Sequence, residues 1–214
     1  MPSVKASKEA KKTVDWRKIR IDQTPGACRV KIGKGQMLDL GGIVKGWSDT
    51  EILAAVAQTS IKSAMIVLGG NTAVYGKPEY GEKWLIGIPR SSEDDEYVGY
   101  IKLGSMDAVT TSGSAQRRIK KDGKVYGHIM NAKTGRSAES DFDYVTVADA
   151  DGARGDALST ALYVMGREKA EAFLKAHPDV RAFLLLKGGR EALVSKGFAD
   201  TVFVREEELK LLER

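Results

Sequence analysis

The stretch "YVTVADADGARGDALSTALYVMG", residues 144–166, decides the class of fold because a strand pattern in it is followed directly by a helix pattern. The first seven residues predict a strand. The segment "GDALSTALYVMG", residues 155–166, opens with Asp156 and closes with Gly166, which matches the residue preferences of helix ends. The chain is therefore expected to combine strands and helices.

The rest of the chain repeats these two element types without a regular βαβ period. Further strands are expected at residues 63–70, 83–89, 98–103, 107–113, 124–131, 181–186 and 191–195. Helices are expected over "GGIVKGWSDTEILAAVAQTS" (41–60) and "EKAEAFLKAH" (168–177). Because strands come in pairs with helices interspersed, an α+β fold with mixed or antiparallel sheets is favoured over a doubly wound fold.

The two ends of the chain carry separate expectations. Residues 1–14 are expected to be a disordered or fraying basic tail, followed by one domain over residues 15–214. The alternating segments "WRKIRID" and "CRVKIG" predict a hairpin around "QTPGA". The closing "VFVREEELKLLER" predicts a strand and a C-terminal helix.

The composition excludes several classes of protein. A hydrophobic content of 42% with 29% charged residues is typical of a soluble globular chain. No apolar run approaches the roughly 20 residues that span a bilayer, and the basic N-terminus has no apolar signal region. The net charge of +5 is spread among acidic residues rather than gathered in a stripe with aromatics, so no nucleic-acid partner is expected. The single cysteine, Cys28, is interpreted as an ordinary strand residue.

The segment "LDLGGIVKG", Leu38–Gly46, is the first candidate binding site. A strand running through glycines into a helix leaves free backbone N–H groups at the positive helix end, which favours an anion. Lys45 is placed to reach that anion, and Asp39 to accept hydrogen bonds from a nucleotide. The alternative is a plain helix entry in which Asp39 is the N-cap and Lys45 is solvated.

A second candidate lies in the helix of the opening stretch. Asp156 and Thr160 are four residues apart, so they share one helix face. A carboxylate and a hydroxyl are hard oxygen donors that suit Mg²⁺. The alternative is that Asp156 is only the N-cap of the helix.

Two polar turns and one histidine complete the candidates. "AVTTSGSAQR" (108–117) presents Thr111, Ser112 and Gly113, and "VLGGN" (67–71) presents Asn71 beside a glycine turn. Their alternative is a glycine-rich strand turn. His128 precedes the turn "NAKTG" and is the side chain best suited to exchange a proton near neutral pH. No His/Cys spacing typical of zinc is present in the sequence.

Taken together, five motifs resemble the ApbE-type flavin transferase family. They occur in the family's order: "LDLGGIVKGW" (38–47), "IVLGGNTAVYG" (66–76), "AVTTSGSAQR" (108–117), "YGHIMNAKTG" (126–135) and "ARGDALSTALYVMG" (153–166). The resemblance implies an ApbE-like α+β fold. It also implies an enzyme that transfers FMN from FAD to a threonine hydroxyl of an acceptor protein, with release of AMP and assistance from Mg²⁺.

The resemblance also assigns roles to residues. It implies that Asp39, Lys45, Asn71, Thr111, Ser112, Gly113 and His128 bind the flavin nucleotide. It implies that the Gly42 carbonyl, Asp156 and Thr160 hold Mg²⁺. His128 is expected beside the pyrophosphate, and we interpret it as the general base for the threonine hydroxyl.

One departure from the family pattern leaves alternatives open. Family members usually carry a further portion before the "DLGG" motif, whereas 38 residues precede Asp39 here. The chain is expected to be truncated or processed, to be completed by a second polypeptide, or to be a shortened relative with an open site. FAD hydrolysis to FMN and AMP, or flavin binding without turnover, are the alternative functions. The resemblance favours a periplasmic or cell-envelope location, with membrane association only through a lost lipoprotein signal, whereas the sequence shows no signal peptide.

Overall fold

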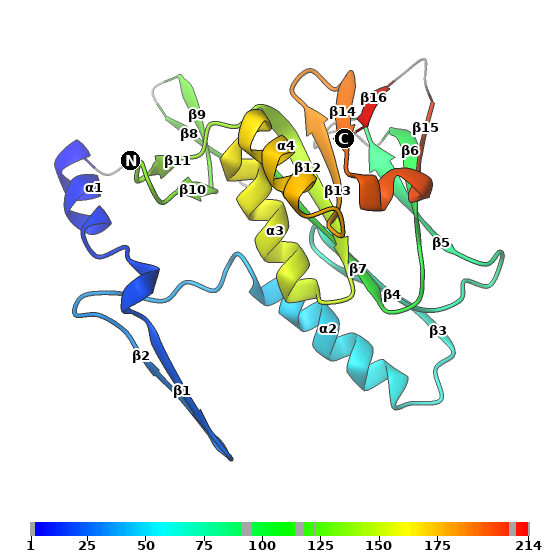
Figure 1. Cartoon of the computed structure of the whole chain (residues 1–214), viewed down its shortest axis with the longest axis horizontal. Coiled ribbons are helices and arrows are strands. Elements are labelled where there is room, and N and C mark those ends of the chain that lie inside the picture. Colours follow the sequence, from blue (N-terminus) through cyan, green and yellow to red (C-terminus); the bar gives the residue numbers. More distant parts are fainter. Residues whose placement is uncertain (1–2, 91–95, 114–117, 122, 206–208, 214) are drawn as a thin grey trace.

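The computed structural model describes residues 3–90, 96–113, 118–121, 123–205 and 209–213. It confirms an α+β fold in which a large mixed sheet lies between a layer of helices and a second, smaller sheet (Figure 1). Within these residues, no helix has both the length and the apolar character needed to cross a membrane.

The large sheet has the strand order β16-β14-β13-β12-β7-β4-β3. Its neighbouring strands pair antiparallel except β14 and β16, which are parallel. The strands are β3 (Ser63–Leu68), β4 (Asn71–Gly76), β7 (Asp107–Gly113), β12 (Phe142–Asp149), β13 (Arg181–Leu186), β14 (Glu191–Val194) and β16 (Lys210–Glu213). The strand predicted by the opening stretch is β12, at the centre of this sheet.

Helices cover one face of the large sheet. They are α2 (Val44–Ala57), α3 (Gly152–Met165) and α4 (Arg167–Ala176). Buried side chains of β12 and β13, such as Val145 and Leu184, pack here against Leu162 of α3 and Leu174 of α4. Helix α2 packs on β4 through Leu53 and Ala73, whereas α3 packs on the central strands β7 and β12 and against α2.

A small sheet covers the opposite face of the large sheet. It has the order β15-β6-β5, from β5 (Trp84–Pro89), β6 (Tyr97–Leu103) and β15 (Val202–Val204). A second core between the two sheets includes Ile88, Ile101, Tyr144 and Phe183. Successive side chains of a strand point to opposite faces, so consecutive residues of β7 reach different layers.

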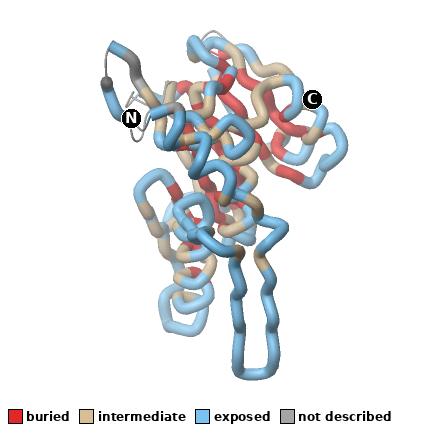
Figure 2. Tube along the Cα trace, turned by 90° about the vertical axis from the view of Figure 1, so that its left-hand side faces the viewer, coloured by how far each residue is buried: buried red, intermediate tan, exposed pale blue. Residues whose placement is uncertain are grey.

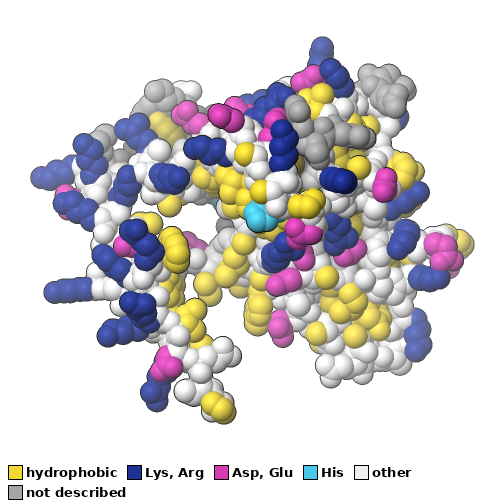
Figure 3. Space-filling model, in the orientation of Figure 1, with side chains coloured by type: hydrophobic (Ala, Val, Ile, Leu, Met, Phe, Trp, Pro, Cys, Tyr) yellow, Lys and Arg dark blue, Asp and Glu magenta, His cyan; other side chains and the backbone are white. Residues whose placement is uncertain are grey.

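The N-terminal segment projects from this body. Helix α1 (Val4–Lys11) forms in the segment expected to be a tail, and a 3₁₀ turn (Trp16–Lys18) follows it. Strands β1 (Arg20–Thr24) and β2 (Ala27–Lys31) form the expected hairpin, every residue of which is exposed (Figure 2). Lys and Arg side chains gather over this segment, and hydrophobic side chains line the opening between it and the body (Figure 3).

Three expectations from the sequence were wrong. Residues 38–40 have no regular structure, so no strand leads into the glycines before α2. The stretch 124–131 is divided between β9 (Lys124–Gly127), which pairs with β8 (Arg118–Lys121), and β10 (Met130–Asn131), which pairs with β11 (Arg136–Ser137). The predicted C-terminal helix is instead strand β16.

The leucines at this end of the chain show why the segment forms a strand rather than a helix. Leu209 and Leu211 contact the core between the sheets, whereas Leu212 packs on the helical side. This alternation has the period of a strand. Tertiary pairing with β14 therefore overrides the helix propensity of "EELKLLE".

Candidate functional site

The site begins where two glycines bring α2 and α3 into backbone contact. A Cβ on Gly46 would lie 1.9 Å from the carbonyl oxygen of Gly152, and one on Gly152 would lie 2.1 Å from that of Gly46. Only glycine permits this approach. Thr50 reinforces the contact, because its Oγ1 accepts a hydrogen bond from the Gly152 N–H at 2.9 Å.

This contact makes Asp156 of α3 a cap for α2. The carboxylate of Asp156 is buried, and its Oδ2 accepts a hydrogen bond from the Gly46 N–H at 3.1 Å. Gly46 lies in the first turn of α2, whose N-cap residue, Ile43, supplies no side-chain hydrogen bond. A carboxylate at this position satisfies a free N–H group and interacts favourably with the helix dipole.

Two alternatives were wrong: Asp156 is not the N-cap of α3, and Asp39 is not the N-cap of α2. Helix α3 begins at Gly152, and its N-cap is Asp151, so Asp156 lies inside the helix. Asp39 does not cap α2, because its Oδ1 accepts a hydrogen bond from the Gly41 N–H at 2.7 Å.

Lys45, Asn71 and Asp49 form a hydrogen-bonded row beside this helix contact. The Lys45 Nζ donates to Asn71 Oδ1 at 3.4 Å, and Asn71 Nδ2 donates to Asp49 Oδ2 at 3.1 Å. Asn71 opens β4 after the glycine turn, and both Asn71 and Asp49 are fully buried. Lys45 and Asn71 were both predicted as binding residues, and the structure brings them together.

Asp49 is unusual because its other carboxylate oxygen, Oδ1, is buried and has no hydrogen-bond partner among the residues that the structure describes. Burial raises the pKa of this carboxyl and the nearby charge of Asp156 raises it further, while the Asn71 hydrogen bond and Lys45 lower it. Buried polar atoms are nearly always paired in native structures. Asp49 is therefore the feature of this site that packing explains least.

A cluster of hydroxyl groups continues the site along α3. The Oγ of Ser112 on β7 lies 2.9 Å from the Oγ of Ser159 and 2.9 Å from the Oγ1 of Thr160. Ser112 and Ser159 are buried, and Thr160 is half-buried. Asp156 and Thr160 are one turn apart on α3, so the carboxylate and the hydroxyl cluster share one helix face.

Thr111 faces the other side of the sheet. Its Oγ1 lies 2.9 Å from the Oγ1 of Thr146 on β12. Both line a cavity of about 360 Å³ between the two sheets, together with Gly69, Gly70, Ile86 and Phe183. Among the described residues, none that lines this cavity is charged. The expected cofactor residues are thus divided between the helical face and this uncharged cavity.

The remaining predicted residues lie outside the hydrogen-bonded groups described above. Asp39 and Gly42 are exposed in the irregular segment before α2. His128 is exposed at the bend between β9 and β10, and no hydrogen bond joins it to the cluster in the described part of the chain. Gly113 ends β7, where an added Cβ would lie 2.8 Å from the Asp143 carbonyl oxygen of β12, and residues 114–117 of its motif lie outside the described residues.

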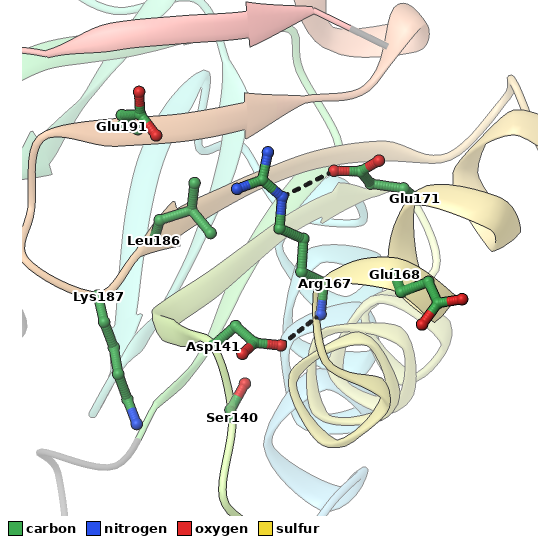
Figure 4. A pocket seen from close by; sticks show the side chains of 8 residues that line it. All are labelled: Ser140, Asp141, Arg167, Glu168, Glu171, Leu186, Lys187 and Glu191. Atoms are coloured by element: carbon green, nitrogen blue, oxygen red, sulfur yellow. Dashed lines mark hydrogen bonds and ion pairs between the residues drawn. The ribbon is translucent and has the colours of Figure 1, made fainter.

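A larger cavity, of about 700 Å³, contains none of the predicted residues (Figure 4). It lies between α4 and the β13–β14 hairpin. Arg167 at its edge donates from Nε to Glu171 Oε1 at 3.0 Å and from its backbone N–H to Asp141 Oδ2 at 2.8 Å. Arg167, Glu171 and Asp141 are thus paired with one another, and none of the predicted residues lines this cavity, so we place the candidate site at the α2–α3 contact instead.

The described residues contain no group of three or more His, Cys, Asp and Glu side chains that could hold a metal ion. A cation at this site would therefore depend on hydroxyl, carbonyl and ligand oxygens in addition to Asp156. Such a mixed oxygen set suits a hard cation rather than zinc.

Sequence reasoning missed Asp49 and Ser159 as site residues. Gly46, Asp49 and Leu53 are the buried residues of α2, and their spacing of three and four marks one helix face. The sequence could have indicated Asp49 because this aspartate lies on the same helix face as Leu53. Ser159 had no comparable signal, because its partner Ser112 is 47 residues away.

Comparison with known proteins identifies relatives along almost the whole chain. The model of the ApbE family matches residues 1–184. An FAD:protein FMN transferase of Klebsiella pneumoniae is 30% identical over 84% of this chain and 54% of its own length. One from Treponema pallidum is 31% identical over 95% of this chain and 59% of its own length. The chain thus spans about half the length of the curated relatives it matches.

Solved structures agree with this assignment. The ApbE protein of Thermotoga maritima superposes with a TM-score of 0.78 at 27% identity, over 97% of this chain and 63% of that protein. The flavin transferase ApbE of Vibrio cholerae has a TM-score of 0.77 at 24% identity, which supports the fold. The chain belongs to the ApbE family.

Proposed function

We propose that this chain carries the catalytic site of an FMN transferase that moves FMN from FAD to a threonine hydroxyl of an acceptor protein. The observation that carries the proposal is the arrangement at the α2–α3 contact of a member of the ApbE family, where Asp156 binds the Gly46 N–H and the neighbouring Lys45 binds Asn71. The relatives named FAD:protein FMN transferase support the reaction class.

The binding part of the proposal assigns FAD to two regions. Lys45 would attract the pyrophosphate, and the Asn71 amide beside it would orient a phosphate or ring group. The uncharged cavity lined by Thr111 suits a flat neutral ring, for which Gly69 and Gly70 allow close backbone approach. Ser112, Gly113 and Asp39 remain proposed contacts of the nucleotide.

The metal part of the proposal assigns Mg²⁺ to Asp156, Thr160 and the Gly42 carbonyl. These residues fit a hard cation: the Asp156 carboxylate uses Oδ2 for Gly46, and the half-buried Thr160 hydroxyl lies one turn away on the same helix face. Gly42 belongs to the turn that leads into the first turn of α2. When bound, Mg²⁺ would supply charge stabilisation to the pyrophosphate oxygens and to the departing AMP.

In the proposed reaction the threonine oxygen forms a bond to the FMN phosphorus while the bond to the AMP oxygen breaks. His128 would accept the threonine proton, because histidine is the side chain used most often as a general base and His128 is exposed to an incoming acceptor. Lys45 would hold the pyrophosphate in line for the attack. Positioning and charge stabilisation dominate phosphoryl transfer, so these groups should matter more than the base.

The test is to incubate the purified chain with FAD and Mg²⁺, with and without an acceptor domain that contains a target threonine. The proposal predicts AMP release only with acceptor, together with an FMN-sized mass gain on the acceptor. AMP release without acceptor would instead indicate FAD hydrolysis. Tight FAD binding with no AMP in either sample would indicate a binding module and would overturn the proposed transfer.

A further inference from the structure

Asp49 has a place in the site that its burial alone does not explain. It is fully buried on α2, one turn after Lys45, and its Oδ1 has no hydrogen-bond partner in the described part of the chain. Leaving a buried carboxylate oxygen unpaired is unfavourable. An apolar residue of similar size would avoid that cost, so the carboxylate has a role beyond packing.

The Asn71 amide connects Asp49 to Lys45. An amide presents a donor on one side and an acceptor on the other, and its orientation follows from its partners. An ionised carboxylate only accepts, so Asp49 requires Nδ2 of Asn71 to face it, at 3.1 Å. The acceptor Oδ1 then faces Lys45 Nζ, at 3.4 Å.

If the amide were reversed, its NH₂ group would face the Lys45 ammonium, and two donors would oppose each other. The ammonium would lose its acceptor and move toward solvent. Lys45 is only half-buried, so its long side chain has room to do so.

We propose that Asp49 is a positioning residue that fixes the Asn71 amide and, through it, holds the Lys45 ammonium at the α2–α3 contact. Its effect on the substrate rests on the proposed function, in which Lys45 attracts the FAD pyrophosphate. Its effect on Lys45 itself does not, and can be measured without any ligand.

The ligand-free test measures how fast Lys45 reacts with an acetylating reagent, by peptide mass spectrometry, relative to the exposed Lys62 in the same sample. Asp49→Leu removes the acceptor at similar size and should raise the relative rate of Lys45 several-fold. Asp49→Asn keeps an oxygen that can accept from Asn71 and should leave the rate near that of the wild type. An unchanged Lys45 rate in Asp49→Leu would overturn the proposal.

The ligand test measures the Kd for FAD in a double-mutant cycle with Lys45→Met. Asp49→Leu should weaken FAD binding about tenfold, as loss of one charge-assisted hydrogen bond does, and Asp49→Asn should restore it. In the Lys45→Met background, Asp49→Leu should have a much smaller effect, because its action through Lys45 is already lost and only its action through the Asn71 amide remains. The same tenfold loss in that background would show a general structural role and would contradict the inference.

A control variant on the same helix is Glu51→Leu, since Glu51 is exposed and its loss changes the net charge equally. It should alter neither the Lys45 rate nor the Kd. If wild-type protein binds no FAD, the proposed function fails, while the acetylation rates still decide the role of Asp49.

Discussion

Replacing Gly46 with alanine tests the glycine contact on which the site is built. The new Cβ would lie 1.9 Å from the Gly152 carbonyl oxygen and 2.8 Å from the Asp156 Cβ. Ordinary contact needs 3.4 Å or more, so α2 and α3 would have to separate by roughly 1.5 Å. That movement would stretch the 3.1 Å hydrogen bond between the Gly46 N–H and Asp156 beyond bonding distance.

The expected cost follows from these two effects. Overpacking costs about 1–3 kcal/mol, and loss of a hydrogen bond to a charged group costs about 1.5–3 kcal/mol. Alanine regains about 1 kcal/mol of helix propensity. We therefore expect the free energy of unfolding to fall by about 2–5 kcal/mol, a large part of the ~5–15 kcal/mol typical of a domain.

The assay is urea unfolding followed by far-UV circular dichroism, with Gly155→Ala as the matched control. Gly155 also lies in a helix, but its added Cβ would meet the Thr110 Oγ1 at 3.3 Å, a contact that small shifts relieve. That variant should stay within about 1 kcal/mol of the wild type. Equal stabilities of the Gly46 and Gly155 variants would refute the reasoning.

Three further predictions concern charged groups. Asp156→Ala should reduce Mg²⁺-dependent AMP release at least as much as His128→Ala, and normal turnover of the Asp156 variant would contradict the metal assignment. Burial raises the pKa of Asp49, so the folded chain retains a proton that the unfolded chain releases. The free energy of unfolding should therefore fall as the pH rises from the ordinary pKa of 3.8 to the pKa in the folded chain. Urea titrations at several pH values should show this slope in the wild type and not in Asp49→Asn. Arg181 donates hydrogen bonds to both carboxylate oxygens of Asp107, at 2.7 and 3.0 Å. Arg181→Met should therefore lower the free energy of unfolding by about 1–3 kcal/mol in the same urea assay. A change below ~0.5 kcal/mol would mean that the pair contributes little to stability.

The sequence alone predicts those helices and strands whose residue pattern is local. The β1–β2 hairpin, the central strand β12 and helix α2 follow from alternation, turn residues and helical periodicity. Strand β16 did not follow, because its state is decided by pairing with β14 rather than by its own propensity.

The candidate site shows the same division between local and distant information. The four-residue spacing of Asp156 and Thr160 predicts a shared helix face, and the structure confirms that both lie on α3. The cap that Asp156 provides to Gly46 joins residues 110 positions apart, so no local pattern contains it. The role of the buried Asp49 could likewise be recognised only from the fold, because its hydrogen-bond partner, Asn71, lies at the start of strand β4.

The most direct measurement of the central claim is the intact mass of an acceptor domain after incubation with this chain, FAD and Mg²⁺. The proposed function predicts an FMN-sized gain that maps to one threonine, disappears when that threonine is replaced by alanine, and is lost with Asp156→Ala. An acceptor of unchanged mass, in a sample where the chain is folded and binds FAD, would contradict it.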